Sequence, residues 1–440
     1  MMNLWTESTD RLLDEMISRG IHRAYLVGKP DGSGMRASHP LFEELAQAVS
    51  ADTRDYRGHQ ACFFEVGKES GHLLSAFVHL TKRGQAAGGL RFWCYERVED
   101  FIRDGLRLSV GMGQKCALAG LWWGGGKGVI ARKKGVDHRD SSIRKKIYQD
   151  YGRFVTGLRG CYVTAEDVGT RTEDMAWIHS TTRHTTCIPE ELGGSGNPSL
   201  LTATGVVVAM EAALEFLGRG DLAGKTVALQ GLGNVSSAMI SDLLERKVGR
   251  IIGTDVDEVA ISEVIRVYKG APLEARQVSP DDHSILGTEC DVVAPNAIGA
   301  TLNPNTIPLI KAPIVCGAAN NQLEDARRDA AAMHKQEVLY VPDFLANRMG
   351  IVNCANEQYG SIGDDPAIRS HLERDNPTGI FQRSMEVFRR AAKSGNTTAQ
   401  EAQALADELA QQLHPMWGNR GQMIINDLVK TGWDKTPVLV

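Results

Sequence analysis

The chain has 440 residues, of which 42% are apolar and 23% charged, and its net charge at pH 7 is −5. This length predicts two domains, since single hydrophobic cores stop growing at ~250–300 residues. The charge gives no electrostatic reason for binding nucleic acid or an anionic membrane, and no apolar run approaches the ~20 residues that span a bilayer. The N-terminus MMNLWTESTDRLLDEM is acidic and lacks the pattern of a signal peptide, so we expect a cytoplasmic protein.

The eight cysteines are scattered singly along the chain. No CxxC pair and no HExxH motif is present, so the sequence gives little support for a metal site. Buried free thiols in a reducing compartment explain these cysteines better.

Short apolar runs precede two long helices in the first half of the chain. The runs ACFFEV, LLSAFVHL and GGLRFWCY, between residues 61 and 95, alternate with turn residues and predict strands. Apolar residues at helical spacing then predict a helix from 98 to 120 and a second one from 141 to 158.

Between these two helices the chain reads GLWWGGGKGVI, from Gly120 to Ile130. Glycine has no side chain, so we expect the backbone here to let a ligand come close to Lys127. A lysine in a tight, poorly hydrated site has a lowered pKa and can act as a base. Taken alone, the stretch fits a flexible surface loop with a solvated lysine equally well.

The composition changes at GGSGNPSL, residues 193–200, which predicts a hinge or linker. Strands and helices alternate beyond it. The expected strands are KTVALQG, GRIIGTD, CDVVAPNA, APIVCGAANN and VLYVPD, with a helix in SSAMISDLLERK. This alternation predicts βαβ units in a doubly wound parallel sheet, an α/β fold of the Rossmann type.

The first of these units carries GLGNVS, Gly231–Ser236, which fits the dinucleotide-binding pattern GxGxxG if serine takes the third position. The N-terminus of the helix that follows can bind a pyrophosphate. Asp255 lies 22 residues after Gly233, at the end of the next strand, where a carboxylate binds the ribose 2′-hydroxyl and repels a 2′-phosphate. These features favour NAD over NADP, and the alternative is a tight turn without a ligand.

Three stretches of the first half place charged residues beside small ones: AAGGLR (86–91), GQKCALAGLWWGGGKGV (113–129) and YVTAEDVGT (162–170). Together with GSGNPSLLTATGV, QGLGNV, CDVVAPNAIGATLN and GAANNQL, they resemble the glutamate, leucine, phenylalanine and valine dehydrogenases, most of all the leucine/phenylalanine branch. The resemblance runs from about residue 56 to 395, with the motifs in the same order.

The resemblance implies a role for individual residues. Lys127 corresponds to the catalytic base, Asp167 takes part in proton transfer, and Lys115 binds the substrate carboxylate. The other substrate contacts that it implies are Gly88, Gly89, Ala87, Ala165, Asn320, Ile351 and Cys354. The cofactor contacts that we expect are Gly231, Gly233, Asn234, Val235, Asp255, Thr202, Ala297 and Asn320.

The expected substrate has an apolar side chain. Ala87 stands where glutamate-type relatives have a lysine, and Ala165 is small. Most relatives have NAGGV where this chain has NRMGI, residues 347–351. Arg348 and Met349 could narrow the pocket or add a positive charge, which leaves an unusual amino acid open as the substrate.

The resulting prediction is an NAD-dependent dehydrogenase that converts an apolar, branched-chain or aromatic L-amino acid reversibly into its 2-oxo acid and ammonia. Residues 1–195, with the tail 396–440 returning to them, are expected to form the substrate-binding and oligomerisation domain, and 196–395 the Rossmann-type domain, with the active site in the cleft between. We expect a homo-oligomer without a metal, a nucleic acid or a membrane as partner. A dehydrogenase for an unusual or biosynthetic amino acid and a non-catalytic NAD-binding amino-acid sensor are the alternatives.

Overall fold

The computed structural model describes residues 3–360 and 362–438, and the chain divides into two compact units. The first unit contains the chain up to Gly196, a short stretch that begins at Glu357, and the tail from Glu408 onward. The second unit contains Asn197–Asn356 and the segment that ends at Asp407. The division after Gly196 falls within the predicted linker, but the tail returns to the first unit later than the expected residue 396.

The helix α14 (Thr398–Ala410) explains this later return. The Thr398 hydroxyl donates a hydrogen bond to the backbone oxygen of Tyr340 at 2.5 Å, and Ala399 packs against a core cluster of the second unit. The first part of the tail is therefore packed within the second unit. The chain after α14 reaches the first unit, where Trp433 packs edge-on against Phe63, with 5.2 Å between the ring centroids.

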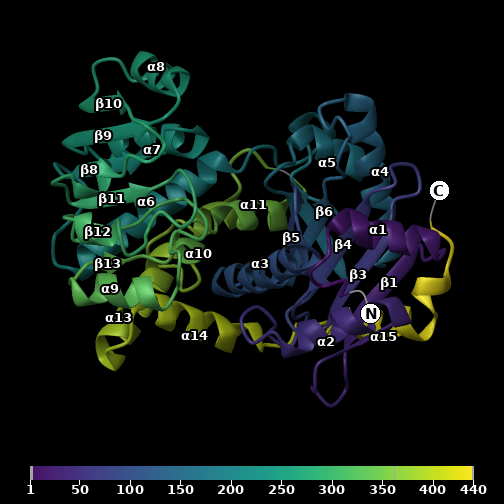
Figure 1. The fold of residues 1–440 in the computed structure, drawn as a ribbon. Helices are drawn as coiled ribbons and strands as arrows, with labels where there is room; N and C mark the ends of the chain where they lie inside the picture. Colours follow the sequence, from purple (N-terminus) through teal and green to yellow (C-terminus); the bar gives the residue numbers. More distant parts are fainter. Residues whose placement is uncertain (1–2, 361, 439–440) are drawn as a thin grey trace. The chain divides into compact units, whose positions relative to one another are not determined.

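A mixed seven-stranded sheet forms the centre of the first unit (Figure 1). Its order is β2-β1-β3-β4-β6-β5-β7, in which β5 runs parallel to β6 and β7 while the other neighbours are antiparallel. The three strands predicted between residues 61 and 95 are confirmed as β3, β4 and β5. The strands are β1 (Arg23–Gly28), β2 (Met35–Ala37), β3 (Ala61–Val66), β4 (Leu73–Val78), β5 (Ala86–Trp93), β6 (Gly124–Ala131) and β7 (Tyr162–Glu166).

Both predicted long helices are present in this unit. The helix α3 begins and ends close to the predicted bounds and packs on β4 and β6 through its buried apolar residues, among them Phe101 and Leu106. The helix α4 begins after Asp140, whose side chain accepts hydrogen bonds from the first free N–H groups of the helix. The helices are α1 (Thr9–Ser18), α2 (Glu43–Ala51), α3 (Val98–Leu118), α4 (Ser141–Gly157), α5 (Thr172–His179) and α15 (Arg420–Lys430).

The second unit contains a six-stranded, all-parallel sheet in the order β10-β9-β8-β11-β12-β13 (Figure 1). This confirms the predicted doubly wound α/β fold. The strands are β8 (Thr226–Gln230), β9 (Arg250–Asp255), β10 (Leu273–Gln277), β11 (Val292–Pro295), β12 (Ile314–Val315) and β13 (Leu339–Tyr340). The other helices are α6 (Ser199–Phe216), α7 (Asn234–Glu245), α8 (Glu258–Val267), α9 (Arg328–Lys335), α10 (Asp343–Ala346), α11 (Met349–Glu357), α12 (Pro366–Ser370) and α13 (Ile380–Ser394).

The helix α6 corrects one expectation from the sequence. Among the described residues, this helix is long and apolar enough to cross a membrane by its length and composition alone, and 56% of it is buried inside the protein. Its Gly205 lies so close to Met349 and Ile380 that an added Cβ would come within 2.7 Å of either side chain. Such tight packing is typical of a helix in a protein core.

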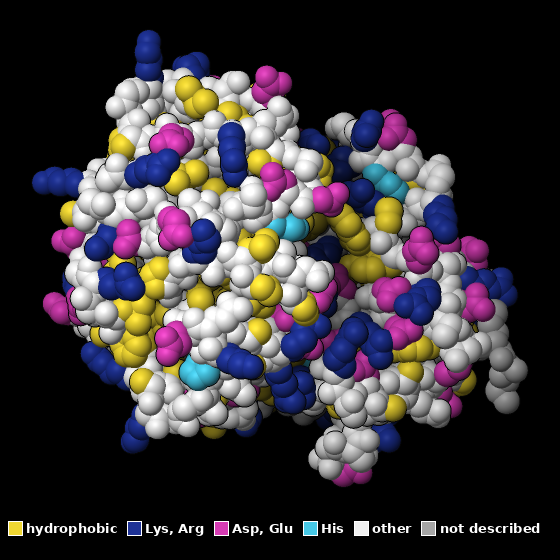
Figure 2. All heavy atoms as spheres, turned by 60° about the vertical axis from the view of Figure 1, so that its left-hand side comes forward, with side chains coloured by type: hydrophobic (Ala, Val, Ile, Leu, Met, Phe, Trp, Pro, Cys, Tyr) yellow, Lys and Arg dark blue, Asp and Glu magenta, His cyan; other side chains and the backbone are white. Residues whose placement is uncertain are grey.

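The surface carries both signs of charge. On the face shown in Figure 2, Lys and Arg side chains are interspersed with Asp and Glu side chains. This distribution agrees with the small net charge of −5.

Candidate active site

Lys127 lies on β6, in the interior of the first sheet. Every residue of this strand is buried, and Lys127 itself is only 3% exposed. The alternative of a flexible surface loop with a solvated lysine is therefore wrong.

The glycines beside Lys127 are explained by packing within the protein. A Cβ added at Gly124 would lie 2.0 Å from the backbone oxygen of Leu80, and one added at Gly125 would lie 2.3 Å from that of Ser109. At Gly128 it would lie 2.0 Å from the Tyr151 hydroxyl. The expectation that these glycines leave space for substrate and cofactor is thus corrected, because protein atoms already fill the space.

Lys127 forms an ion pair with Asp167, the first residue after β7. Its Nζ donates a hydrogen bond to Asp167 Oδ2 at 2.7 Å. Gly89 of β5 makes this approach possible, because a Cβ at that position would come within 2.7 Å of Asp167 Cβ. The two residues that the sequence predicts as catalytic are therefore in direct contact.

The surroundings shift the pKa of both groups. Burial lowers the pKa of Lys127 below its ordinary value, and the cation of Arg91 lowers it further, while Asp167 acts in the opposite direction. Burial alone would raise the pKa of Asp167, but Lys127 and Arg91 together lower it to about 2. The site thus combines a carboxylate whose pKa is lowered with a lysine that loses its proton more readily than a solvated one.

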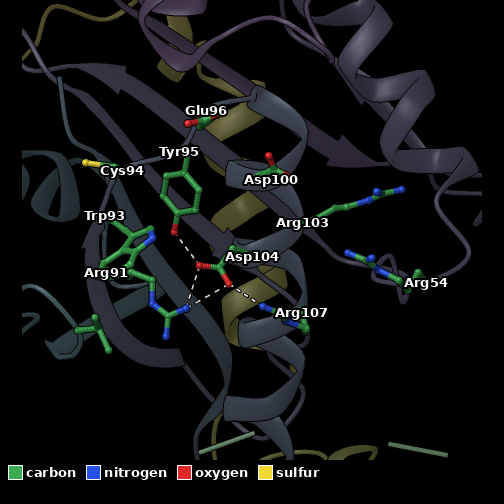
Figure 3. A pocket seen from close by; sticks show the side chains of 11 residues that line it. Arg54, Arg91, Trp93, Cys94, Tyr95, Glu96, Asp100, Arg103, Asp104 and Arg107 are labelled. Carbon is green, nitrogen blue, oxygen red and sulfur yellow. Dashed lines mark hydrogen bonds and ion pairs between the residues drawn. The ribbon is translucent and has the colours of Figure 1, made fainter. Parts of the chain in front are cut away.

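Arg91 on β5 extends this pair into a network of charged groups. Its Nε donates to Asp167 Oδ2 at 3.1 Å, and its Nη1 donates to both oxygens of Asp104 on α3, at 3.1 and 2.9 Å. The Tyr95 hydroxyl donates to Asp104 Oδ2 at 2.6 Å, and Arg107 Nη2 donates to Oδ1 at 2.9 Å (Figure 3). No motif in the sequence predicted a role for these residues. Arg91 stands in the AAGGLR motif, but the sequence does not show which acid on α3 it contacts.

A cavity of about 580 Å³ opens beside this network in the first unit (Figure 3). Arg91, Asp104 and Tyr95 line it together with Arg107, and the half-exposed Val168 completes the wall next to Asp167. The cavity therefore reaches Arg91, Tyr95 and Asp104 of this network, while Lys127 and Asp167 are not among its lining residues.

Four of the predicted substrate residues of the first unit lie on β5 and β7, and β5 pairs with the strand of Lys127. Ala87 and Gly89 of β5 pair with Val163 and Ala165 of β7, and since side chains alternate along a strand, they share the face of the sheet from which Arg91 reaches α3. Ala87 and Ala165 are 1% and 6% exposed. Gly88 lies between Ala87 and Gly89 and therefore faces the other side of the sheet, where a Cβ would come within 1.8 Å of the Gly126 backbone oxygen.

Lys115 lies near the end of α3 and is half-buried. Gly113, two residues earlier, packs against the start of β6, since a Cβ added there would lie 3.1 Å from Gly125 Cα. The structure therefore places Lys115 on the helix that covers the strand of Lys127.

In the second unit, the predicted nucleotide-binding turn joins β8 to α7. Gly231 adopts a φ of 91°, a conformation that favours glycine, and a Cβ there would lie 3.0 Å from Ala297 Cβ. Gly233 is the N-cap residue of α7, so no capping side chain occupies the first N–H groups of the helix. A Cβ added at this glycine would meet no atom within 4 Å. The N–H groups of Asn234 and Val235 in the first turn of α7 suit a pyrophosphate.

Asp255 is the last residue of β9 and is half-buried. Its Oδ2 accepts a hydrogen bond from the backbone N–H of Leu232 at 2.6 Å, so the same carboxylate that would meet a ribose also fixes the glycine-rich turn. Ser236, at the third position of the fingerprint, is buried and accepts a hydrogen bond from Asn296 Nδ2 at 3.0 Å. This bond explains why a serine fits where glycine or alanine is usual. The residues present thus fit a dinucleotide.

The other predicted cofactor contacts of this unit come from three segments. Ala297 and Asn320 follow the carboxyl ends of β11 and β12, the edge at which parallel sheets bind ligands. Asn320 Oδ1 accepts a hydrogen bond from Asn347 Nδ2 at 3.0 Å. Thr202 lies in the first turn of α6, where its hydroxyl donates to the backbone oxygen of Pro198 at 2.9 Å.

Arg348 and Met349 point into the interior of the second unit. Both side chains are fully buried, and Arg348 Nη2 donates to the backbone oxygen of Thr378 at 2.5 Å. Burial, and then Arg383, lower the pKa of Arg348 to about 9. Ile351 and Cys354, the predicted wall of the substrate pocket, are buried on the following helix, α11.

The comparisons with known proteins agree with both units. The family described as Glu/Leu/Phe/Val dehydrogenase, dimerisation domain, matches residues 60–184, and the family described as Glutamate/Leucine/Phenylalanine/Valine dehydrogenase matches residues 193–411. The chain belongs to the Glu/Leu/Phe/Val dehydrogenase family. It is an NAD-dependent amino-acid dehydrogenase, as the sequence predicts.

Individual relatives show which branch it resembles. A leucine dehydrogenase of Bacillus subtilis (strain 168) is 38% identical over 360 residues, which are 82% of this chain and 92% of the relative. A phenylalanine dehydrogenase of Lysinibacillus sphaericus is 34% identical over 78% of this chain and 86% of its own. The crystal structure of L-tryptophan dehydrogenase from Nostoc punctiforme superposes with a TM-score of 0.65 at 31% identity, covering 80% of this chain and 96% of that one. These matches confirm the predicted similarity to the leucine/phenylalanine branch.

Proposed function

We propose that the protein oxidatively deaminates an apolar L-amino acid, with Lys127 as the general base and Asp167 as its partner in proton transfer. The contact between Lys127 Nζ and Asp167 Oδ2 at 2.7 Å, within a buried site, carries the proposal. The reaction converts the amino acid, NAD⁺ and water into the 2-oxo acid, ammonium, NADH and a proton.

NAD, when bound, accepts the hydride that leaves the substrate Cα. Lys115 pairs with the substrate carboxylate and orients the amino acid. Lys127, with its pKa lowered by burial and by Arg91, removes a proton from the water that attacks the substrate imine. Asp167 accepts the hydrogen bond of Lys127, holds the amino group of the substrate and relays protons between them.

We also propose that Asp255 selects NAD over NADP. Its carboxylate is held by the Leu232 N–H at the end of β9, in the position at which an acidic residue binds the ribose 2′-hydroxyl and repels a 2′-phosphate. The first turn of α7 supplies the N–H groups for the pyrophosphate.

The proposed substrate side chain is branched or aromatic. Ala87 and Ala165 present small apolar groups on the face of Lys127, and neither could neutralise a second carboxylate. The names of the relatives, which are leucine, phenylalanine, valine and tryptophan dehydrogenases, point in the same direction. Arg348 and Met349 are buried in the second unit, where Arg348 Nη2 donates to the backbone oxygen of Thr378, and this supports a pocket without an added charge.

We expect the protein to act in the cytoplasm as a homo-oligomer assembled through the first unit, whose residues 60–184 match a dimerisation domain. The predicted cleft between the two domains remains a prediction.

The test is the rate of NADH formation with each of about twenty L-amino acids, repeated with NADP. We expect turnover with leucine, valine, isoleucine, phenylalanine or tryptophan, none with glutamate, and a strong preference for NAD. Turnover with glutamate alone would refute the apolar pocket, and a panel without any turnover would refute the proposed reaction for these substrates.

A further inference from the structure

Arg91 bridges two carboxylates that lie on different elements. Through Nε it donates to Asp167 and through Nη1 to both oxygens of Asp104, so one planar guanidinium on β5 connects the segment after β7 to α3. Its side chain is 18% exposed, and that of Asp104 is 10% exposed. A planar group held at both ends has little freedom to rotate.

Asp104 is itself held by further contacts. The Tyr95 hydroxyl and Arg107 Nη2 donate to its two oxygens, and its backbone lies inside the long helix α3 (Figure 3). Arg91 pulls the pKa of Asp104 below its usual value although burial acts to raise it. Asp104 is therefore a fixed anion against which Arg91 is oriented.

Asp167 Oδ2 accepts hydrogen bonds from both Lys127 and Arg91. In the proposed reaction Lys127 must be neutral to act as a base, and a neutral amine attracts a carboxylate only weakly. Arg91 keeps its charge at any working pH. Its contact with Asp167 therefore persists in the step in which the attraction of Lys127 is lost.

We propose that Arg91 is a positioning residue for the deamination reaction: oriented by Asp104, its guanidinium fixes the Asp167 carboxylate against Lys127. This inference rests on the proposed roles of Lys127 and Asp167. Nothing in the family resemblance assigns such a role to Arg91 or Asp104.

Other charged groups near the site do not replace this contact. Glu166, next to Asp167, accepts a hydrogen bond from the Thr172 hydroxyl at 3.0 Å. Arg107 contacts Asp104 from the exposed side of α3, with 55% of its side chain exposed. The titratable side chains that interact with Asp167 include Lys127, Arg91, Tyr95, Tyr162 and Glu166, and Asp104 is linked to it through Arg91.

The experiment compares Arg91→Gln, Arg91→Lys and Asp104→Asn with the control Arg11→Gln, at an exposed arginine of α1 that pairs with Glu15. We expect Arg91→Gln to lower kcat about 10–100-fold, the loss that follows from a misplaced catalytic group, while KM for the amino acid changes less than about 3-fold. Arg91→Lys keeps the charge and should recover part of kcat. Removing the cation should also move the acidic limb of the kcat/KM profile to higher pH, because Arg91 lowers the pKa of Lys127. Arg11→Gln should leave both readouts close to wild type.

A double-mutant cycle tests whether Asp104 acts through Arg91. Asp104→Asn should lower kcat about 10-fold on its own and add nothing in the Arg91→Gln background. If the loss of kcat in the double variant equalled the product of the two single-variant losses, the inference would be overturned. A wild-type kcat for Asp104→Asn would also overturn it, and this result can be obtained even if Arg91→Gln fails to fold. Lys127→Ala is measured in parallel. If Lys127→Ala stays active, the proposed function is refuted. If Lys127→Ala is inactive but the Arg91 and Asp104 variants have the wild-type kcat, only this inference is refuted.

Discussion

Replacing Asp167 with asparagine should lower the pKa of Lys127 and should also lower kcat. The carboxylate accepts the hydrogen bond of Lys127 Nζ at 2.7 Å, and it is the main group that raises the pKa of this lysine against the effects of burial and Arg91. Asparagine keeps the shape of the side chain but removes its charge. Only the smaller effect of Asp104 then opposes burial and Arg91, so the pKa of Lys127 falls.

The size of this shift follows from the contact. An opposite charge within about 4–6 Å changes a pKa by about 1–3 units, and this pair is closer than that. We therefore expect the acidic limb of the kcat/KM profile to move about 1–3 pH units lower in Asp167→Asn, while kcat falls about 10²–10⁴-fold because proton transfer loses a participant.

The assay is the initial rate of NADH formation as a function of pH with saturating NAD. The ammonium group of the free amino acid titrates identically for every variant, so a difference between profiles belongs to the protein. Glu166→Gln is the matched control, because this neighbouring carboxylate contacts Thr172, and its acidic limb should stay in place. An acidic limb for Asp167→Asn that stays in place or moves to higher pH would refute the assigned electrostatics.

Two further predictions concern the cofactor turn and the glycine-rich strand. Asp255→Ala should weaken NAD binding about 10–100-fold, the loss of a hydrogen bond to a charged group, and should reduce the preference for NAD over NADP, as measured by titration with each cofactor. The control is Asp257→Ala, which removes only the N-cap of α8. An unchanged cofactor preference in Asp255→Ala would exclude Asp255 from the ribose site. Gly128→Ala should lower the free energy of unfolding by about 1–3 kcal/mol, because its Cβ would lie 2.0 Å from the Tyr151 hydroxyl. Gly111→Ala on α3, where a Cβ would meet no atom within 4 Å, should not destabilise the protein, and equal denaturation midpoints for the two variants would contradict the packing explanation.

Local patterns in the sequence predicted the elements that depend on local physics. The spacing of apolar residues predicted α3 from 98 to 120, and it is observed at Val98–Leu118. The fingerprint Gly231–Ser236 predicted the turn between β8 and α7, because a left-handed glycine and a free helix N-terminus are encoded within a few residues. The family motifs likewise predicted Lys127 and Asp167, which the structure brings into contact.

What the sequence could not predict depends on packing between distant segments. The glycines of β6 are explained by atoms of Leu80, Ser109 and Tyr151, none of which belongs to the strand. The contact between Arg91 and Asp104 joins a strand to a helix, and the pattern of α3 does not distinguish Asp104 from its other acidic residues. The substitution of Arg348 looked like a change in the pocket, because the sequence does not show that its side chain turns into the core.

Lys127 is the base in the proposed reaction, so the decisive measurement is turnover by Lys127→Ala at saturating amino acid and NAD. NAD affinity is measured on the same samples, and Lys134→Ala, at an exposed lysine, is the control. We predict that Lys127→Ala loses about 10²–10⁴-fold in kcat, the usual contribution of a general base, and still binds NAD with wild-type affinity, since the predicted nucleotide-binding residues belong to the other unit. A Lys127→Ala enzyme that turns over near the wild-type rate would contradict the proposed mechanism.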